Sequence, residues 1–170
     1  ISGTVTWTQI GDDIDGEEYG DRSGSSVSLS ADGTILAVGA EANDGANGSD
    51  SGHVRVFQYQ VISGTATWTQ LGQDIDGEAA GDGSGRSVSL SSDGTRVAIG
   101  APSNDDGGTN SGHVRIYEYS NNSWTKLGQD LDGEEGLTYS TQANQFGLSI
   151  SLSSDGSRIA IGGHLSLIHS

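Results

Sequence analysis

The chain has 170 residues and 28 glycines, and its 23 Asp and Glu against 7 Lys and Arg give a formal charge of −16. This acidity argues against binding to a nucleic-acid backbone, which requires a positively charged protein face. No segment approaches the ~20 apolar residues of a membrane span, and the absence of cysteine excludes disulfides and thiol chemistry.

One sequence unit of about 60 residues occurs three times, the last time incompletely. Trp-Thr-Gln at Trp7 returns at Trp68 and, as Trp-Thr-Lys, at Trp124. Gly-His-Val-Arg-Val at 52–56 returns at 112–116 with Ile in the last position. High glycine content is typical of disordered segments, but a shared period with variation in loop length predicts a folded repeat architecture.

Each complete unit predicts four short strands and no helix. In the first unit, serine alternates with apolar residues over 26–30, which predicts a half-buried strand. Asp32-Gly33 then supplies the left-handed backbone of a tight hairpin turn. The continuous apolar run over 35–38 predicts a strand that is covered on both faces. After a polar loop, further strands are expected over 53–59 and around Trp68.

Central strands that are apolar on both faces require other sheets on both sides, and radial stacking of four-stranded sheets is a β-propeller. Repeat length and strand count favour a propeller over a β-sandwich or a linear β-solenoid. We therefore expect an all-β chain that forms a partial β-propeller of four-stranded antiparallel blades, with about two and a half to three blades present. A seven-bladed ring would need roughly 420 residues, so this chain cannot close one.

The repeats predict the following boundaries. Residues 1–23 hold the last strand of a preceding blade and an acidic connecting loop. Residues 24–84 and 85–146 each hold one blade together with its acidic loop. Residues 147–162 are the first half of a third blade, and the tail 163–170 matches neither earlier copy.

Glycine pairs recur at the ends of these strands. The third unit begins with Phe146-Gly147, where the first two have Ser-Gly at 23–24 and 84–85. The second unit ends its second strand with Gly100-Ala101-Pro102. These residues resemble the FG-GAP repeat family, the units of the integrin α-subunit propeller. The resemblance extends to about Gly162 and is specific for the fold.

More than half of the 23 acidic residues lie on three equivalent loops, each of which precedes a unit. Their shared Asp-x-Asp-Gly-Glu segment offers closely spaced hard oxygens and a glycine for a sharp bend, as calcium prefers. Two interpretations stay open, a calcium loop and a solvated acidic turn. The calcium loop of integrin-like units, between the first two strands, is missing here. The candidate calcium ligands are Asp13, Asp15, Glu17, Asp21, Asp74, Asp76, Glu78, Asp82, Asp130, Asp132 and Glu134.

Other repeated residues favour structural roles. His53 and His113 begin equivalent strands, and their repetition predicts a hydrogen bond between adjacent strands rather than catalysis. Arg55 and Arg115 are expected to pair with acids or to be exposed. The tryptophans are expected to pack between blades rather than stack on sugars. The Asn-Asp-Gly loops that begin at Asn43 and Asn104 are interpreted as turns rather than ligand sets.

The resemblance implies a non-catalytic binding or adhesion module of an extracellular or cell-surface protein, which recognises a protein or glycan through its loops. No nucleophile elbow stands in a strand-to-helix context, so no enzyme activity is expected. We expect no nucleic-acid partner and no direct membrane insertion, and the remaining blades of the parent chain would be further partners. Two alternatives remain: an accessory propeller domain of a larger secreted enzyme, and a calcium-stiffened structural repeat array.

Overall fold

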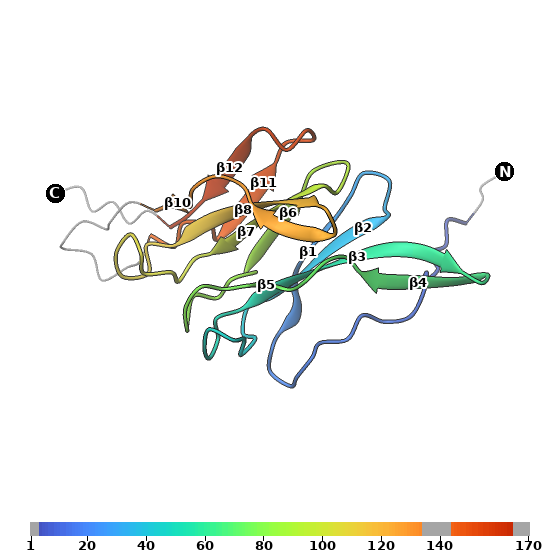
Figure 1. Cartoon of the computed structure of the whole chain (residues 1–170), viewed down its shortest axis with the longest axis horizontal. Helices are drawn as coiled ribbons and strands as arrows, with labels where there is room; N and C mark the ends of the chain where they lie inside the picture. The colour runs from blue at the N-terminus through green and yellow to red at the C-terminus, as the bar shows by residue number, and fades with distance from the viewer. Residues whose placement is uncertain (1–3, 134–143, 165–170) are drawn as a thin grey trace.

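The structure is a computed structural model that describes residues 4–133 and 144–164. Over these residues the chain forms strands, turns and loops in three antiparallel sheets, as Figure 1 shows. The all-β prediction is therefore confirmed, and the sheets do not close into a ring. Within the described part of the chain there is no helix with the length and apolarity to cross a membrane.

The first sheet has the strand order β1-β2-β3-β4, and the short β5 pairs with the beginning of β3 beyond the end of β4. The second sheet repeats this plan with β6-β7-β8-β9 and with β10 on β8. The strands of the first sheet are β1 (Ser23–Leu29), β2 (Ile35–Ala40), β3 (His53–Ile62), β4 (Thr65–Gln70) and β5 (Ile75–Asp76). Those of the second sheet are β6 (Ser87–Leu90), β7 (Arg96–Ala101), β8 (His113–Ser120), β9 (Ser123–Lys126) and β10 (Leu131–Asp132).

Among the described residues, the third sheet consists of β11 (Ser149–Leu152) and β12 (Ile159–Gly162). It corresponds to the first two strands of the other sheets, as the repeat predicts. At the other end, residues 4–22 form no strand, although the sequence predicts one around Trp7. A strand needs a neighbour for its backbone hydrogen bonds, and no described strand pairs with this segment. The short β5 and β10, which the sequence did not predict, attach the second and third acidic loops to β3 and β8.

The predicted Asp-Gly turns are confirmed in all three units. Gly33 has a φ of +75°, and the equivalent Gly94 and Gly156 have φ values of +69° and +64°. In the third turn, the Asp155 carboxylate accepts hydrogen bonds from the Ser153 hydroxyl at 2.7 Å and from the Ser157 amide at 3.0 Å. These donors, with the Ser153 hydroxyl first, lower the pKa of Asp155 to about 2.

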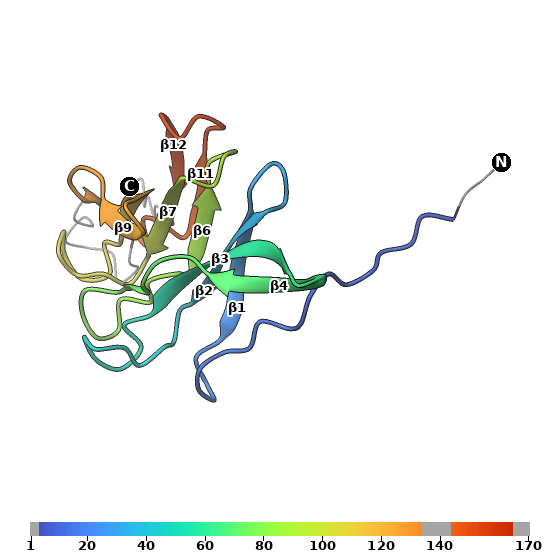
Figure 2. The same ribbon diagram turned by 45° about the vertical axis from the view of Figure 1, so that its right-hand side comes forward.

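Serines of the first strand in the first and second sheets join that sheet to the next one. The Ser26 hydroxyl donates to the carbonyl oxygen of Gly85 at 2.7 Å, and Ser28 Oγ accepts the Leu90 amide at 2.9 Å. The same two bonds recur one unit later, from Ser87 to Gly147 and from Leu152 to Ser89. Figure 2 shows β1, β6 and β11 following one another through the three sheets. We refer to these bonds as the serine ladder.

The apolar side chains of the same strands point the other way. Val88 and Leu90 of β6 are 9 % and 7 % exposed because they pack into the core between the first and second sheets. Their equivalents in β1, Val27 and Leu29, are 61 % and 55 % exposed. No further sheet of the described chain covers them. The predicted strand forms, but in β1 its serine side faces the next sheet and its apolar side is exposed, whereas the equivalent apolar side of β6 is buried.

Candidate functional site

The acidic connecting loops lie against the β2–β3 and β7–β8 loops at one edge of the sheets. The Asn47 side-chain amide donates to the carbonyl oxygen of Gly77 at 2.7 Å, and the Gly77 amide donates to the carbonyl oxygen of Gly52 at 2.8 Å. The acidic connecting loops and the β2–β3 and β7–β8 loops, which the sequence analysis interprets separately, therefore form one surface. We call this surface the acidic edge, made of residues 12–22, 41–52, 73–86 and 103–112.

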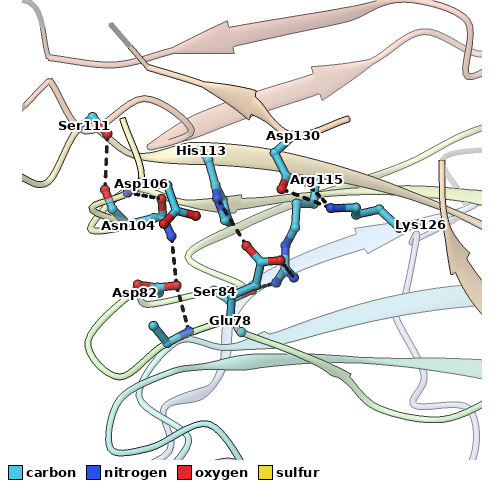
Figure 3. Close-up of polar contacts among 12 residues, drawn as sticks. Glu78, Asp82, Ser84, Asn104, Asp106, Ser111, His113, Arg115, Lys126 and Asp130 are labelled. Carbon is cyan, nitrogen blue, oxygen red and sulfur yellow. Dashed lines mark hydrogen bonds and ion pairs between the residues drawn. The ribbon is translucent and has the colours of Figure 1, made fainter. Parts of the chain in front are cut away.

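Asp21 and Asp82 are buried hydrogen-bond acceptors within the acidic edge. They are 5 % and 3 % exposed. The Asp21 carboxylate accepts from the side chain of Asn43 and from the Glu18 amide, both at 3.0 Å. Asp82 is held in the same way by Asn104 at 3.1 Å (Figure 3). These two predicted calcium ligands, and the Asn-Asp-Gly loops opposite them, therefore share one structural role as loop clasps.

Arg55 and Arg115 clamp the acidic loops onto the strands β3 and β8. Both are buried, 8 % and 4 % exposed. The Arg115 guanidinium donates to the backbone carbonyl of Asp76 at 2.8 Å and lies 3.3 Å from the Glu78 carboxylate. Arg55 donates to the carbonyl of Asp15 at 2.6 Å. The predicted pairing of these arginines with acids is confirmed.

Each unit also brings one histidine between two acids from different loops. Glu78, His113 and Asp130 each offer one ligand atom, and these atoms lie within 4.8 Å of one another (Figure 3). The first unit repeats the cluster with its equivalent residues, Glu17, His53 and Asp74. Among the described residues these are the groups of three or more whose ligand atoms come this close. We call them the second and first Glu-His-Asp clusters.

His113 is fully buried, and among residues 4–133 and 144–164 neither of its ring nitrogens has a hydrogen-bond partner. Its Nδ1 lies 3.8 Å from Glu78 Oε2, which is beyond hydrogen-bond distance. The predicted hydrogen bond between strands is therefore wrong for this residue. Burial lowers the pKa of His113, and the nearby Arg115 guanidinium lowers it further, so the ring is neutral at pH 7.

The other predicted ligands do not meet at one point. Asp13 accepts from the Gln9 side chain at 2.9 Å and, with Asp15, lines a cavity of about 230 Å³ beside Trp68. A separate cavity of about 330 Å³ is lined by Glu17, Asp21, His53, Asp74 and Asp76. Asp132 lies in β10 opposite His113, and Glu134 lies outside the described residues.

Sequence reasoning missed the two clusters because it treated each acidic loop as a complete ligand set. Within a cluster, the glutamate comes from the loop before the sheet, whereas the aspartate follows the fourth strand. The repeated histidine between them was the available signal, since two acids and a histidine recur together in both units.

No curated protein sequence matches the chain. Among solved structures, a chain from a complex of KlAtg21 with the coiled-coil of AgAtg16 is 15 % identical, with a TM-score of 0.48. That alignment covers 81 % of this chain and 36 % of the other, so the chain spans about a third of that protein's length. A family model described as FG-GAP repeat matches residues 13–57 and 75–117, more than half of the sequence, and the chain belongs to the FG-GAP repeat family.

Proposed function

We propose that the chain is part of a non-catalytic recognition module of an extracellular or cell-surface protein, and that the acidic edge is its binding surface. The main observation behind this proposal is that loops of successive units lie together at this edge and expose acidic side chains there. Glu18, Asp44 and Asp106 are exposed, and the formal charge of the chain is −16. A basic surface on a protein partner has the complementary charge.

The loop clasps support this proposal because they hold the edge in one conformation. A surface that is ordered before binding loses less conformational entropy when a partner docks. Asp21 and Asp82 are buried in these contacts, while Glu18, on the loop of Asp21, and Asp106, on the loop of Asn104, remain exposed. Burial of one set of acids and exposure of the other thus divides the loops into a frame and a contact surface.

The test uses the full chain against two arrays, one of Lys- and Arg-rich peptides and one of neutral glycans. We expect binding to the basic peptides that weakens as salt rises from about 0.05 to 0.5 M, since salt screens exposed charges. The triple variant Glu18→Gln, Asp44→Asn, Asp106→Asn should lose most of it. Asp32→Asn, in a turn outside the edge, is the control. Binding to neutral glycans alone, or equal binding by the triple variant, would contradict a charge-based protein partner.

Location outside the cell needs its own experiment. We expect an antibody against the parent protein to label intact, unpermeabilised source cells or to detect the protein in the medium. Labelling only after permeabilisation would refute the extracellular part of the proposal while leaving the binding surface to be judged by the arrays.

A second candidate function is a structural repeat array that bound calcium makes more rigid. The specific observation is the cavity of about 330 Å³ whose lining includes the carboxylates of Glu17, Glu18, Asp44 and Asp76. These residues offer the oxygen ligands that calcium selects. Calorimetry with calcium and with a chelator should then show a higher melting temperature in calcium. Equal melting temperatures would count against this function.

A further inference from the structure

The Glu-His-Asp clusters have the donor set of a different kind of metal. We propose that each cluster is a site for a divalent transition-metal ion of the zinc class, held by one imidazole nitrogen and two carboxylate oxygens. The first site consists of Glu17, His53 and Asp74, and the second of Glu78, His113 and Asp130.

The evidence is strongest for the second cluster, because the ring nitrogens of its histidine have no hydrogen-bond partner among the described residues. A buried polar group without a hydrogen-bond partner is unfavourable, and native structures rarely keep one without a reason. Within the part of the chain that the structure describes, both ring nitrogens of His113 are in that state, and the residue is 0 % exposed. A metal ion bound to one of these nitrogens would satisfy it, and neutral imidazole is the form that binds metal.

The glutamate of each cluster is oriented with one oxygen available to a metal. Glu78 Oε1 faces the Arg115 guanidinium at 3.3 Å, while Oε2 faces His113 Nδ1 at 3.8 Å. In the first cluster, Glu17 Oε1 lies 3.7 Å from Arg55 and Oε2 lies 3.9 Å from His53. An outer partner that orients a ligating carboxylate is a usual feature of metal sites. The arginine thus acts as a positioning residue.

Closing the site requires only a small movement of side chains. Tetrahedral zinc with bonds of about 2.0–2.1 Å separates its ligand atoms by roughly 3.4 Å. The ligand atoms of the clusters lie within 4.8 Å of one another, so a contraction of at most about 1.4 Å is sufficient. The glutamate side chains are 44 % and 36 % exposed, which leaves them free to make that movement and leaves water access to the remaining coordination position.

Imidazole in the donor set decides the class of ion. Calcium and magnesium select oxygen ligands, whereas imidazole suits zinc, copper, nickel and iron. Because the chain contains two copies of the site, we expect two ions of this class for each chain. This inference does not rest on the proposed recognition function, since the probe is a metal ion and the readout is binding.

The two sites differ in the side chain that already pairs with the aspartate and would compete with a metal ion for it. This difference provides an internal test. Asp130 is paired with the Lys126 ammonium group at 2.8 Å, a positive charge that must release the carboxylate before a metal binds. At the equivalent position in the first unit, the neutral Gln70 amide donates to Asp74 at 2.6 Å. The first site should therefore bind zinc more tightly than the second. Lys126→Gln should make the second site several-fold tighter.

The experiment is calorimetric titration of the full chain with zinc chloride, with cobalt(II) absorption as a second readout of the ligand field. We expect two bound ions in wild type and one in either Glu17→Gln or Glu78→Gln, with the affected site weakened by more than ~10-fold. His53→Asn and His113→Asn should act in the same way. Asp12→Asn, an exposed acid outside both clusters, is the matched control and should not change zinc binding.

Circular dichroism establishes which variants fold, and the exposed glutamates give a test that does not require mutation of a buried residue. Unchanged zinc affinity and stoichiometry in folded Glu17→Gln and Glu78→Gln would overturn the proposal. Displacement of zinc by an equal concentration of calcium, or failure of wild type to bind zinc, would also overturn it. Loss of one ion in each single variant with retention of binding in Asp12→Asn supports it.

Discussion

The indole nitrogen of Trp124 donates a hydrogen bond to the backbone carbonyl of Leu71, in the preceding unit, at 2.8 Å. Trp68 repeats this contact with the carbonyl of Ile10 at 3.1 Å. Trp124 is 3 % exposed and packs in the main core, whereas Trp7 is 98 % exposed. For Trp68 and Trp124, the contact ties the fourth strand of one unit to the chain that leaves the previous unit. The predicted packing role is borne out there and not for Trp7.

Replacement of Trp124 should therefore destabilise the fold through two effects that can be measured separately, the loss of the hydrogen-bond donor and the loss of packed volume. Trp124→Phe keeps most of the apolar volume and loses the donor, which should reduce the free energy of unfolding by about 1 kcal/mol or more. Trp124→Ala adds the cavity and should cost ~3–5 kcal/mol. Urea unfolding followed by circular dichroism measures both. Trp7→Phe is the control and should stay within ~0.5 kcal/mol of wild type, and an equal effect of both Phe variants would contradict this account.

Gly85 is required by a close approach of three backbone segments. Its φ is +89°, and a Cβ there would lie 2.5 Å from the carbonyl oxygen of His53. Gly24 occupies the equivalent position with a φ of +86° and has nothing within 4 Å of such a Cβ. Gly24→Ala should cost only the backbone strain, about 1–2 kcal/mol.

Gly85→Ala should cost clearly more than Gly24→Ala, because the steric clash adds to the same backbone strain. Thermal or urea unfolding of the two variants, side by side with wild type, gives the difference directly. If the two substitutions reduce the free energy of unfolding equally, the close approach of the sheets at Gly85 does not exist in solution.

The clasp between Asp82 and Asn104 should be measurable as a coupling energy. Asp82→Ala leaves the side-chain amide of the buried Asn104 without its acceptor, which should cost ~1–3 kcal/mol. Asn104→Ala removes the other partner, and the double variant completes a cycle. We expect a coupling of ~0.5–3 kcal/mol from unfolding in urea. Coupling indistinguishable from zero would mean that the clasp does not hold the loops together.

The turn carboxylates should remain ionised in acid. Hydrogen bonds lower the pKa of Asp155 to about 2, below its ordinary 3.8. A carboxyl group with a lowered folded-state pKa stabilises the protein fully above 3.8, and this contribution is lost as the pH falls through about 2. Carboxyl carbon chemical shifts followed by NMR from pH 5 to pH 1.5 give the midpoint.

Ser153→Ala removes the largest cause of the lowered pKa and should move the midpoint of Asp155 toward 3.8. Ser151→Ala changes a neighbouring serine that has no contact with this carboxylate among the hydrogen bonds of the described residues, and serves as the control. A wild-type midpoint at 3.8 would show that the turn hydrogen bonds are absent.

The sequence predicts most of the fold because the determinants are local and repeated. Asp32-Gly33 specifies its turn through residues two positions away from Asp32. The continuous apolar run of β2 indicates a strand that is buried on both faces. The Glu-His-Asp clusters could not be predicted in this way, because Glu78 and Asp130 are separated by about 50 residues and meet only through the pairing of β10 with β8. The partner of each serine in the ladder likewise lies one unit away, so alternation alone shows a polar face without showing what it contacts.

The serine ladder has a consequence for how such chains change over generations. The second unit has both halves of this contact: Ser87 and Ser89 of β6 bond to the third unit, while Leu90 of β6 and Gly85 just before that strand bond to serines of β1. Gain or loss of a whole unit by unequal recombination therefore joins surfaces that already match. A gene of this kind can alter its copy number without a compensating substitution at the new junction.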